Sequence, residues 1–200
     1  MYKQGRNMQH ILYLHGFLSS PSSVKAQATK DYFAVHHPDV QVHIPALSNF
    51  PSKVEAQLTA LIEQTPALLT NGLKVIGSSM GGYLSTFLIE KYAGRAVLIN
   101  PAVRPYELLQ QFIGPHVNPY SGEKFTIEAS DIDVIRALDA NTLSEQKAYK
   151  VLLQTNDETL DYRLAAAKYA LSELVIEEGG DHSFVGYENH LPSIADFLLD

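Results

Sequence analysis

Short apolar runs alternate with longer amphipathic segments along most of the chain. The apolar runs are rich in β-branched and aromatic residues, which is typical of buried strands, and they lie at residues 10–14, 40–44, 73–76, 95–99, 149–153 and 174–176. Helical patterns lie at about 22–36, 51–64, 80–92, 160–171 and 188–199. This alternation predicts an α/β three-layer sandwich, with a mostly parallel sheet of about six strands between two layers of helices.

One long segment, residues 101–147, interrupts the alternation. It is rich in residues that break regular structure: Pro101, Pro105, Gly114, Pro115, Pro119 and Gly122. We predict no strand in it, but helical patterns at 106–113 and 131–140. The segment therefore reads as a helical insertion, and a long connection in a compact domain is usually functional or mobile. Two interpretations have equal weight: a lid over an active site, or a crossover that covers the sheet edge.

Composition limits the classes of function. The 200 residues are 46% hydrophobic and 18% charged, which suits a single domain (residues 1–200) that buries roughly 70% of its unfolded surface. The formal charge of −7 disfavours nucleic acid as a partner, because no cluster of Lys and Arg is available to neutralise phosphates. Cysteine is absent, so a disulfide framework, a thiol nucleophile and a cysteine-rich metal site are all excluded.

Localisation and cofactors follow from the same inventory. Residues 1–10 are polar and lack the apolar core of a secretory signal, and no run of 18 apolar residues occurs. We expect a cytoplasmic protein that has no membrane partner. Five of the eight histidines suit solvated or structural roles and show no metal-ligand spacing: His36, His37, His43, His116 and His190. We predict neither a metal site nor a cofactor.

The pentapeptide Gly77-Ser78-Ser79-Met80-Gly81 stands between an apolar strand and an amphipathic helix. This arrangement is typical of the nucleophile elbow of an α/β-hydrolase, in which the central residue has a strained backbone and projects its side chain from the sheet. Small residues are needed two positions before and after it, and Gly77 and Gly81 meet this need. Ser79 is therefore the candidate nucleophile, and the Met80 amide is a candidate donor to an oxyanion.

A serine hydroxyl needs a base, and the base needs a group that fixes its tautomer. In α/β-hydrolases these residues follow in the chain order serine, acid, histidine. Asp157 comes after the run 149–153, and His182 after the run 174–176, so they are the candidate acid and base. Asp157 could instead be only the N-cap of the next helix. Asp161, within that helix, and Asp181, adjacent to the base, are weaker candidates for the acid.

The tripeptide His15-Gly16-Phe17 directly follows the first strand. This fold places there the loop that supplies the second oxyanion donor, and we assign that donor to the Phe17 amide. His15 is expected to hold the loop by hydrogen bonds. If the first strand lies between the second and third strands, this loop and Ser79 meet at one topological switch point. No role is assigned to Arg104, Tyr106 or Tyr120.

These motifs together resemble the YqiA/YcfP-type small bacterial esterases of the α/β-hydrolase superfamily. The resemblance covers nearly the whole chain and rests on the runs 12–17, 77–83, 100–105, 118–120, 157–162 and 179–184. It implies esterase activity on short acyl esters, with Ser79, Asp157 and His182 matching the triad, but it names no physiological substrate. Two positions depart from the expected pattern: Asn156 replaces a glycine, and Asp181 replaces an asparagine.

The leading hypothesis is a serine esterase that cleaves short-chain acyl esters through an acyl-enzyme. An acyl-CoA thioesterase would use the same machinery, so the expected partner is a small-molecule acyl ester or thioester. An alternative hypothesis from another functional class is a non-catalytic ligand-binding protein with the same fold. The presence of all three triad residues disfavours it.

Overall fold

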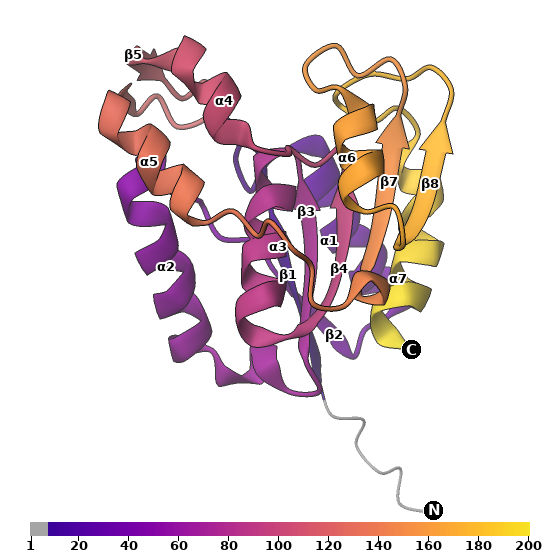
Figure 1. Cartoon of the computed structure of the whole chain (residues 1–200). Helices are drawn as coiled ribbons and strands as arrows, with labels where there is room; N and C mark the ends of the chain where they lie inside the picture. Colours follow the sequence, from indigo (N-terminus) through magenta and orange to yellow (C-terminus); the bar gives the residue numbers. More distant parts are fainter. Residues whose placement is uncertain (1–7) are drawn as a thin grey trace, which may run out of the picture.

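A six-stranded parallel sheet forms the centre of the computed structural model, which describes residues 8–200 (Figure 1). The strands are β1 (Gln9–Leu14), β2 (Val40–His43), β3 (Leu73–Ser78), β4 (Gly94–Ile99), β7 (Tyr149–Gln154) and β8 (Glu173–Glu177). Their spatial order is β2-β1-β3-β4-β7-β8, and every neighbouring pair is parallel. The predicted fold class and the predicted position of the first strand are confirmed. The expectation for the polar N-terminal stretch falls mainly on residues 1–7, outside the described residues.

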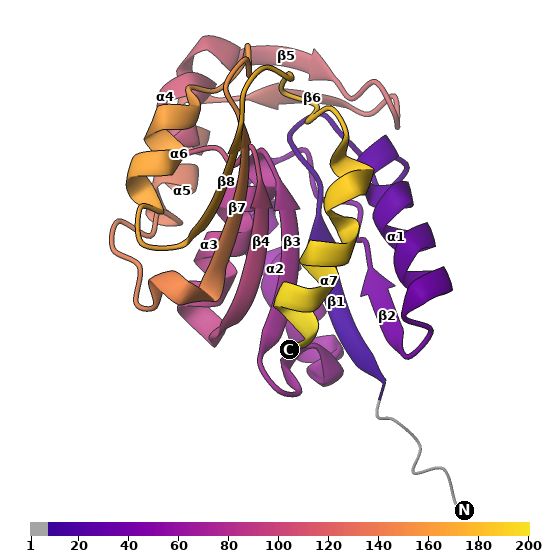
Figure 2. The ribbon, with the colours of Figure 1, turned by 90° about the vertical axis from the view of Figure 1, so that its right-hand side faces the viewer.

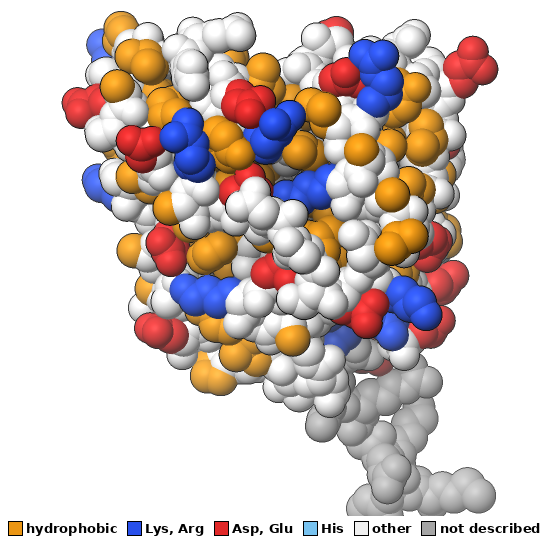
Figure 3. All heavy atoms as spheres, in the orientation of Figure 1, with side chains coloured by type: hydrophobic (Ala, Val, Ile, Leu, Met, Phe, Trp, Pro, Cys, Tyr) orange, Lys and Arg blue, Asp and Glu red, His pale blue; other side chains and the backbone are white. Residues whose placement is uncertain are grey.

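Helices cover both faces of this sheet. They are α1 (Val24–His36), α2 (Pro51–Gln64), α3 (Met80–Tyr92), α4 (Pro105–Leu109), α5 (Ala129–Ala137), α6 (Tyr162–Lys168) and α7 (Leu191–Leu199). Figures 1 and 2 show α1 and α7 on one face, and α2, α3 and α6 on the other. On the second face, side chains of both charges are interspersed with apolar ones (Figure 3).

The strands divide the core into two clusters because successive side chains point to opposite faces of a sheet. In β1, Leu12 and Leu14 join the cluster under α2 and α3, whereas Ile11 and Tyr13 join the cluster under α1 and α7. Both faces of the sheet are buried, so the central strands read as continuous apolar runs rather than as alternating ones. That property made these strands recognisable in the sequence.

The segment 101–147 contains α4 and α5, but also a hairpin that the sequence analysis missed. Strands β5 (Gly114–Val117) and β6 (Lys124–Ile127) pair antiparallel, so the prediction that no strand lies in this segment is wrong. Each strand has four residues, and β5 includes a proline, so local propensity is weak. The hairpin depends instead on tertiary packing: the Phe125 ring packs edge-on against the rings of Phe17 and Phe50.

The segment lies at the end of the molecule toward which the strands run (Figures 1 and 2). This is the end where β3 stops at Ser78 and where loops from the other strands meet. That the segment opens as a lid stays a prediction. Across residues 8–200, no helix is both long enough and apolar enough to span a bilayer.

Candidate active site

Ser79 lies at a sharp turn between β3 and α3. Its φ of 56° and ψ of −119° are strained for a residue that carries a side chain. Hydrogen bonds hold the turn: the Ser79 amide donates to the Ile99 carbonyl (3.0 Å), and the Ser79 carbonyl accepts from the Ala102 amide (3.1 Å). A Cβ at Gly77 or Gly81 would overlap neighbouring backbone atoms. The geometry is thus that of the predicted elbow, and it explains why both glycines are needed.

Three side chains distant in the sequence meet at this turn. The Nε2 atom of His182 lies 3.1 Å from the Oγ atom of Ser79, and its Nδ1 atom lies 2.9 and 2.8 Å from the two carboxylate oxygens of Asp157. A carboxylate accepts only, so Nδ1 of a neutral imidazole carries the proton and Nε2 is free to accept one from the serine. The structure therefore brings together the three residues predicted as nucleophile, base and acid.

Asp157 is fixed by its own loop as well as by His182. Its Oδ1 atom accepts from the amides of Thr159 (2.9 Å) and Leu160 (2.8 Å), and its side chain is only 2% exposed. The N-cap of α6 is Asp161, which accepts from the Arg163 amide (3.0 Å). The alternative that Asp157 caps this helix is therefore wrong, and the alternative that Asp161 is the acid loses support.

The two predicted oxyanion donors lie beside Ser79. Gly16 approaches so closely that a Cβ on it would lie 3.3 Å from the Cβ of Ser79. Phe17 lines a cavity with Ser79 and a second cavity with Met80. Within residues 8–200, neither the Phe17 amide nor the Met80 amide donates a hydrogen bond. Both N–H groups are thus available to an oxygen atom of a ligand.

His15 holds the loop in place. Its Nδ1 donates to the Gly16 carbonyl (2.9 Å), and its Nε2 accepts from the Leu47 amide (3.1 Å). A ring that donates at one nitrogen and accepts at the other is neutral. Burial lowers the pKa of His15, and its hydrogen bond to Gly16 opposes this shift only in part. The expectation that His15 holds the loop by hydrogen bonds is confirmed.

Two buried amides that the sequence analysis gave no role hold the loop of His182. Asn100, at the end of β4, donates to the carbonyls of Asp181 (3.0 Å) and His182 (3.3 Å). Gln154, at the end of β7, accepts from the amides of Asp181 (3.2 Å) and Val185 (2.9 Å). Their only signal in the sequence is a polar amide at the end of a buried apolar strand.

Two charged side chains also contact this loop without having been predicted. Glu158 accepts from the His182 amide (2.9 Å), a hydrogen bond that lowers the pKa of this carboxyl group. Lys25 of α1 donates to the Ser183 carbonyl (2.8 Å) and lines the cavity that contains Ser79 and His182. Burial lowers the pKa of Lys25, while the carboxylates of Asp181, Asp157 and Glu188 act in the opposite direction.

The two departures from the expected pattern have different consequences. Asn156 needs no glycine, because its φ is not positive, and its amide donates to the Gly179 carbonyl (3.0 Å). The Oδ1 atom of Asp181 is buried, and no group within residues 8–200 donates a hydrogen bond to it. Lys25 is a positive charge that interacts electrostatically with this carboxylate.

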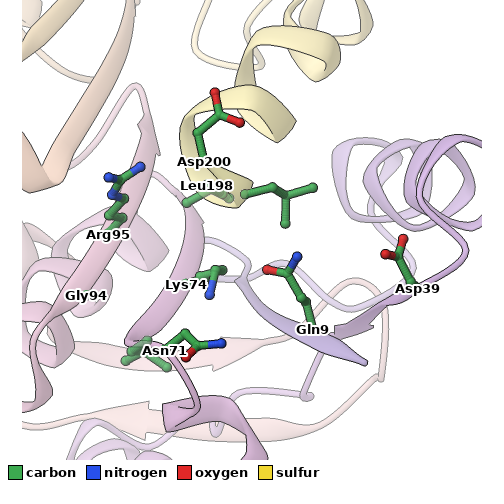
Figure 4. Close-up of a pocket in the computed structure, with 10 residues that line it drawn as sticks. Gln9, Asp39, Asn71, Lys74, Gly94, Arg95, Leu198 and Asp200 are labelled. Atoms are coloured by element: carbon green, nitrogen blue, oxygen red, sulfur yellow. The ribbon is translucent and has the colours of Figure 1, made fainter. Parts of the chain in front are cut away.

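Two cavities of different character flank Ser79. One, of about 140 Å³, has a lining of mixed polarity that includes Ser23, Lys25, His182 and Ser183. The other, of about 40 Å³, is largely apolar and lies beside Phe17 and Met80. A further hollow of about 620 Å³ lies at the opposite, amino ends of β1, β3 and β4, around Gln9, Lys74 and Arg95 (Figure 4). It contains none of the predicted site residues.

The residues left unassigned lie outside both cavities beside Ser79. Tyr106 donates to Asp139 (2.9 Å), Arg104 pairs with Glu107 (3.2 Å), and Tyr120 is 55% exposed. In the described part of the chain, no group of three His, Asp or Glu side chains converges to hold a metal ion.

Comparison with known proteins places the chain in a family. The model of uncharacterised protein family UPF0227 matches residues 10–199, so the chain belongs to this family, and the resemblance to YqiA-type proteins is confirmed. Several solved structures share the fold. A protein of Agrobacterium vitis S4 that is classed as a hydrolase has 18% identity and a TM-score of 0.71, over 96% of this chain and 88% of that one.

Two further structures extend this likeness. The esterase domain of a Rhodothermus marinus protein has 13% identity and a TM-score of 0.69, over 98% of this chain and 88% of that one. Alpha/beta hydrolase domain-containing protein 10 from mouse has 15% identity and a TM-score of 0.68, over 96% of this chain and 89% of that one. At these identities the likeness shows the α/β-hydrolase fold.

Proposed function

We propose that this member of the UPF0227 family is a serine esterase that hydrolyses short-chain acyl esters in the cytoplasm. The observation that carries the proposal is the chain of hydrogen bonds from Ser79 through His182 to Asp157. A ligand-binding protein has no use for a strained turn that aims a hydroxyl at the free nitrogen of an oriented imidazole. The esterase domain of the Rhodothermus marinus protein, which shares the fold, supports the same reaction class.

The geometry suits acyl transfer in two steps. Nε2 of His182 takes the Ser79 proton while Oγ attacks the ester carbonyl, and the carbonyl oxygen becomes an oxyanion held by the Phe17 and Met80 amides. The tetrahedral intermediate collapses, the C–O bond to the alcohol breaks, and His182 returns its proton to the leaving oxygen. Water, deprotonated by His182, then attacks the acyl-serine, and the carboxylic acid leaves as Ser79 regains its proton.

Hydrolysis of p-nitrophenyl acetate and butyrate by the parent and by Ser79→Ala tests the proposal. The variant should lose at least about 1,000-fold in kcat, because oxyanion donors and binding sustain only residual catalysis. Ser52→Ala is the matched control: it removes an exposed serine hydroxyl of α2, outside both cavities, and should keep the activity. Equal rates for the parent and folded Ser79→Ala would remove the claim.

A fluorophosphonate probe separates the esterase from a protein that only binds ligands. The probe should form an adduct with the parent and with Ser52→Ala, but not with Ser79→Ala. A binding-only protein would acquire no adduct at Ser79. Esters and thioesters of the same acyl group then separate the esterase from a thioesterase, since an esterase has the higher kcat/KM for the oxygen ester.

A further inference from the structure

The cavity beside the two oxyanion amides is apolar and is built by both the core and the insertion. Val54 of α2 and Leu84 of α3 supply the core side, and Leu109 of α4 and Ile135 of α5 supply the insertion side. These four side chains are 2 to 6% exposed, so they are held by packing rather than free to move aside. The Tyr83 hydroxyl also donates to the Ile135 carbonyl (2.6 Å), which fastens α5 to α3 beside the cavity.

The positions of the donors and the base decide which half of an ester enters each cavity. His182 must protonate the departing alcohol oxygen, so the alcohol lies on the side of His182. That side is the cavity of mixed polarity, whose lining includes His182 together with Ser23, Lys25 and Ser183. The apolar cavity contains Phe17 and Met80 but not His182. The acyl chain remains on Ser79 after the alcohol leaves. It therefore occupies the apolar cavity.

We propose that this apolar cavity binds the acyl chain and that Leu84 and Ile135 set the chain length that it accepts; the proposal rests on the proposed esterase function. Leu84 follows Met80 by one helical turn on the same face of α3, and both residues line the cavity, so Leu84 lies one turn farther along the helix from Ser79 than the oxyanion amide. The cavity of about 40 Å³ holds roughly three groups the size of water, each needing about 10–15 Å³. This space matches an acyl group of about three or four carbons.

The test is the chain-length profile of kcat/KM for p-nitrophenyl esters from acetate to octanoate. The parent should peak near butyrate. Leu84→Ala and Ile135→Ala lengthen the cavity, so their optimum should move to hexanoate or beyond, with a gain of about fourfold per additional buried methylene relative to butyrate. Because a cavity in the core could unfold the protein, Leu84→Val and Ile135→Val provide milder variants, whose optimum should move in the same direction. Leu164→Ala, on α6 and outside both cavities, is the matched control and should keep the parent profile.

A second series, with butyrate fixed and the alcohol varied, tests the orientation. Leu84 and Ile135 variants should leave the preference among alcohols within twofold of the parent. Two results would overturn the proposal. In one, the folded variants show the same dependence of kcat/KM on acyl length as the parent. In the other, only their preference among alcohols changes. The proposed function fails separately, through activity retained in Ser79→Ala, so the two failures are distinguishable.

Discussion

At the scale of single residues, Asp157 combines two tasks in one carboxylate: it orients His182 and it accepts two amides of its own loop. Asp157→Asn keeps an acceptor oxygen for the loop but gives His182 an amide that favours the wrong tautomer. We expect kcat to fall by about 10⁴-fold, as for the same change in other triads, with little loss of stability. Activity assays and thermal unfolding measure the two effects.

Asp161→Asn is the matched control, because Asp161 caps α6 through the Arg163 amide and contacts neither His182 nor Ser79. Asparagine caps helices as well as aspartate does, so this variant should keep both the activity and the melting temperature. Equal losses of activity in the two variants would contradict the assignment of Asp157 as the acid.

Lys25 is a charge whose removal should change the pH dependence of the reaction. Lys25 interacts with the carboxylates of Asp181, Asp157 and Glu188. It lines the same cavity as His182, and His182 in turn contacts Asp157 and Glu158. In Lys25→Met the carboxylates lose this compensation, and a protonated imidazole becomes more favourable beside them. The acidic limb of kcat/KM, where the base must lose its proton, should therefore move upward by about half a pH unit or more.

Lys25→Arg keeps the charge and should keep the limb within a few tenths of a pH unit of the parent. Profiles of kcat/KM from pH 5 to 9 measure both variants. If Lys25→Met lowered the rate equally at every pH, Lys25 would act only by holding the Ser183 carbonyl. A flat parent profile from pH 5 to 8 would contradict His182 as the base.

The sequence could predict the reacting residues, but not those that hold them. Ser79 and Met80 belong to a local motif, and Asp157 and His182 follow from chain order, because the topology fixes which loops meet. Asn100 and Gln154 both contact the loop at Asp181, which lies 81 and 27 residues further along the chain, respectively. No short pattern encodes such a contact, since it depends on the register of neighbouring strands.

At the scale of elements, the hairpin β5–β6 is tied to the loops of the site by one buried asparagine. Asn118 donates to the Ser19 carbonyl (3.3 Å) and to Asn49 (2.8 Å), and it accepts from the amides of Tyr120 and Ser121. Asn118→Ala removes all four bonds. We expect a loss of about 2 kcal/mol of local stability and faster proteolysis within 114–127.

Limited proteolysis followed by mass spectrometry measures this effect. Tyr120→Ala, in the same turn but with an exposed side chain, should be cleaved at the parent rate. If Asn118→Ala were as resistant as the parent, the aromatic packing of Phe125 on Phe17 and Phe50 would suffice to hold the hairpin.

Long elements were predictable, whereas short ones were not. The predicted helices at 51–64 and 80–92 match α2 and α3. The helix expected at 188–199 begins as a short 3-10 helix, Tyr187–His190, because Pro192 favours the first turn of α7 rather than its interior. The hairpin was missed because its stability comes from rings elsewhere in the sequence, which override weak local propensity.

At the scale of the whole molecule, the parallel sheet gathers the site from loops that are far apart in the chain. Five of the parallel strands have their carboxyl ends at the same end of the sheet. The loops that follow them carry Phe17 (after β1), Ser79 (after β3), Asn100 (after β4), Asp157 (after β7) and His182 (after β8). The hollow at the opposite end of the sheet is lined by the amino ends of β1, β3 and β4, and none of the predicted site residues lines it (Figure 4). Strand direction thus decides which end of the sheet carries chemistry.

The same sheet depends on contacts that join β7 to the helical layer, and Glu90 of α3 makes several of them. It accepts from the hydroxyl of Tyr149, at the start of β7, and from the amide and hydroxyl of Ser144. Desolvation alone would raise the pKa of Glu90, but the hydrogen bonds from Ser144 and Tyr149, with the charge of Lys168, lower it overall. A carboxylate whose pKa is lower in the folded state stabilises the fold above its unfolded pKa.

Glu90→Gln should therefore cost about 1 kcal/mol of unfolding free energy at pH 7, at the modest end because the group is partly solvated. The difference from the parent should shrink as pH falls below about 4, since the parent then loses the same charge. Urea unfolding at pH 7, 5 and 3 measures it. Glu63→Gln, on the exposed side of α2, should match the parent throughout. A deficit that stayed constant down to pH 3 would show that Glu90 stabilises the sheet without its charge.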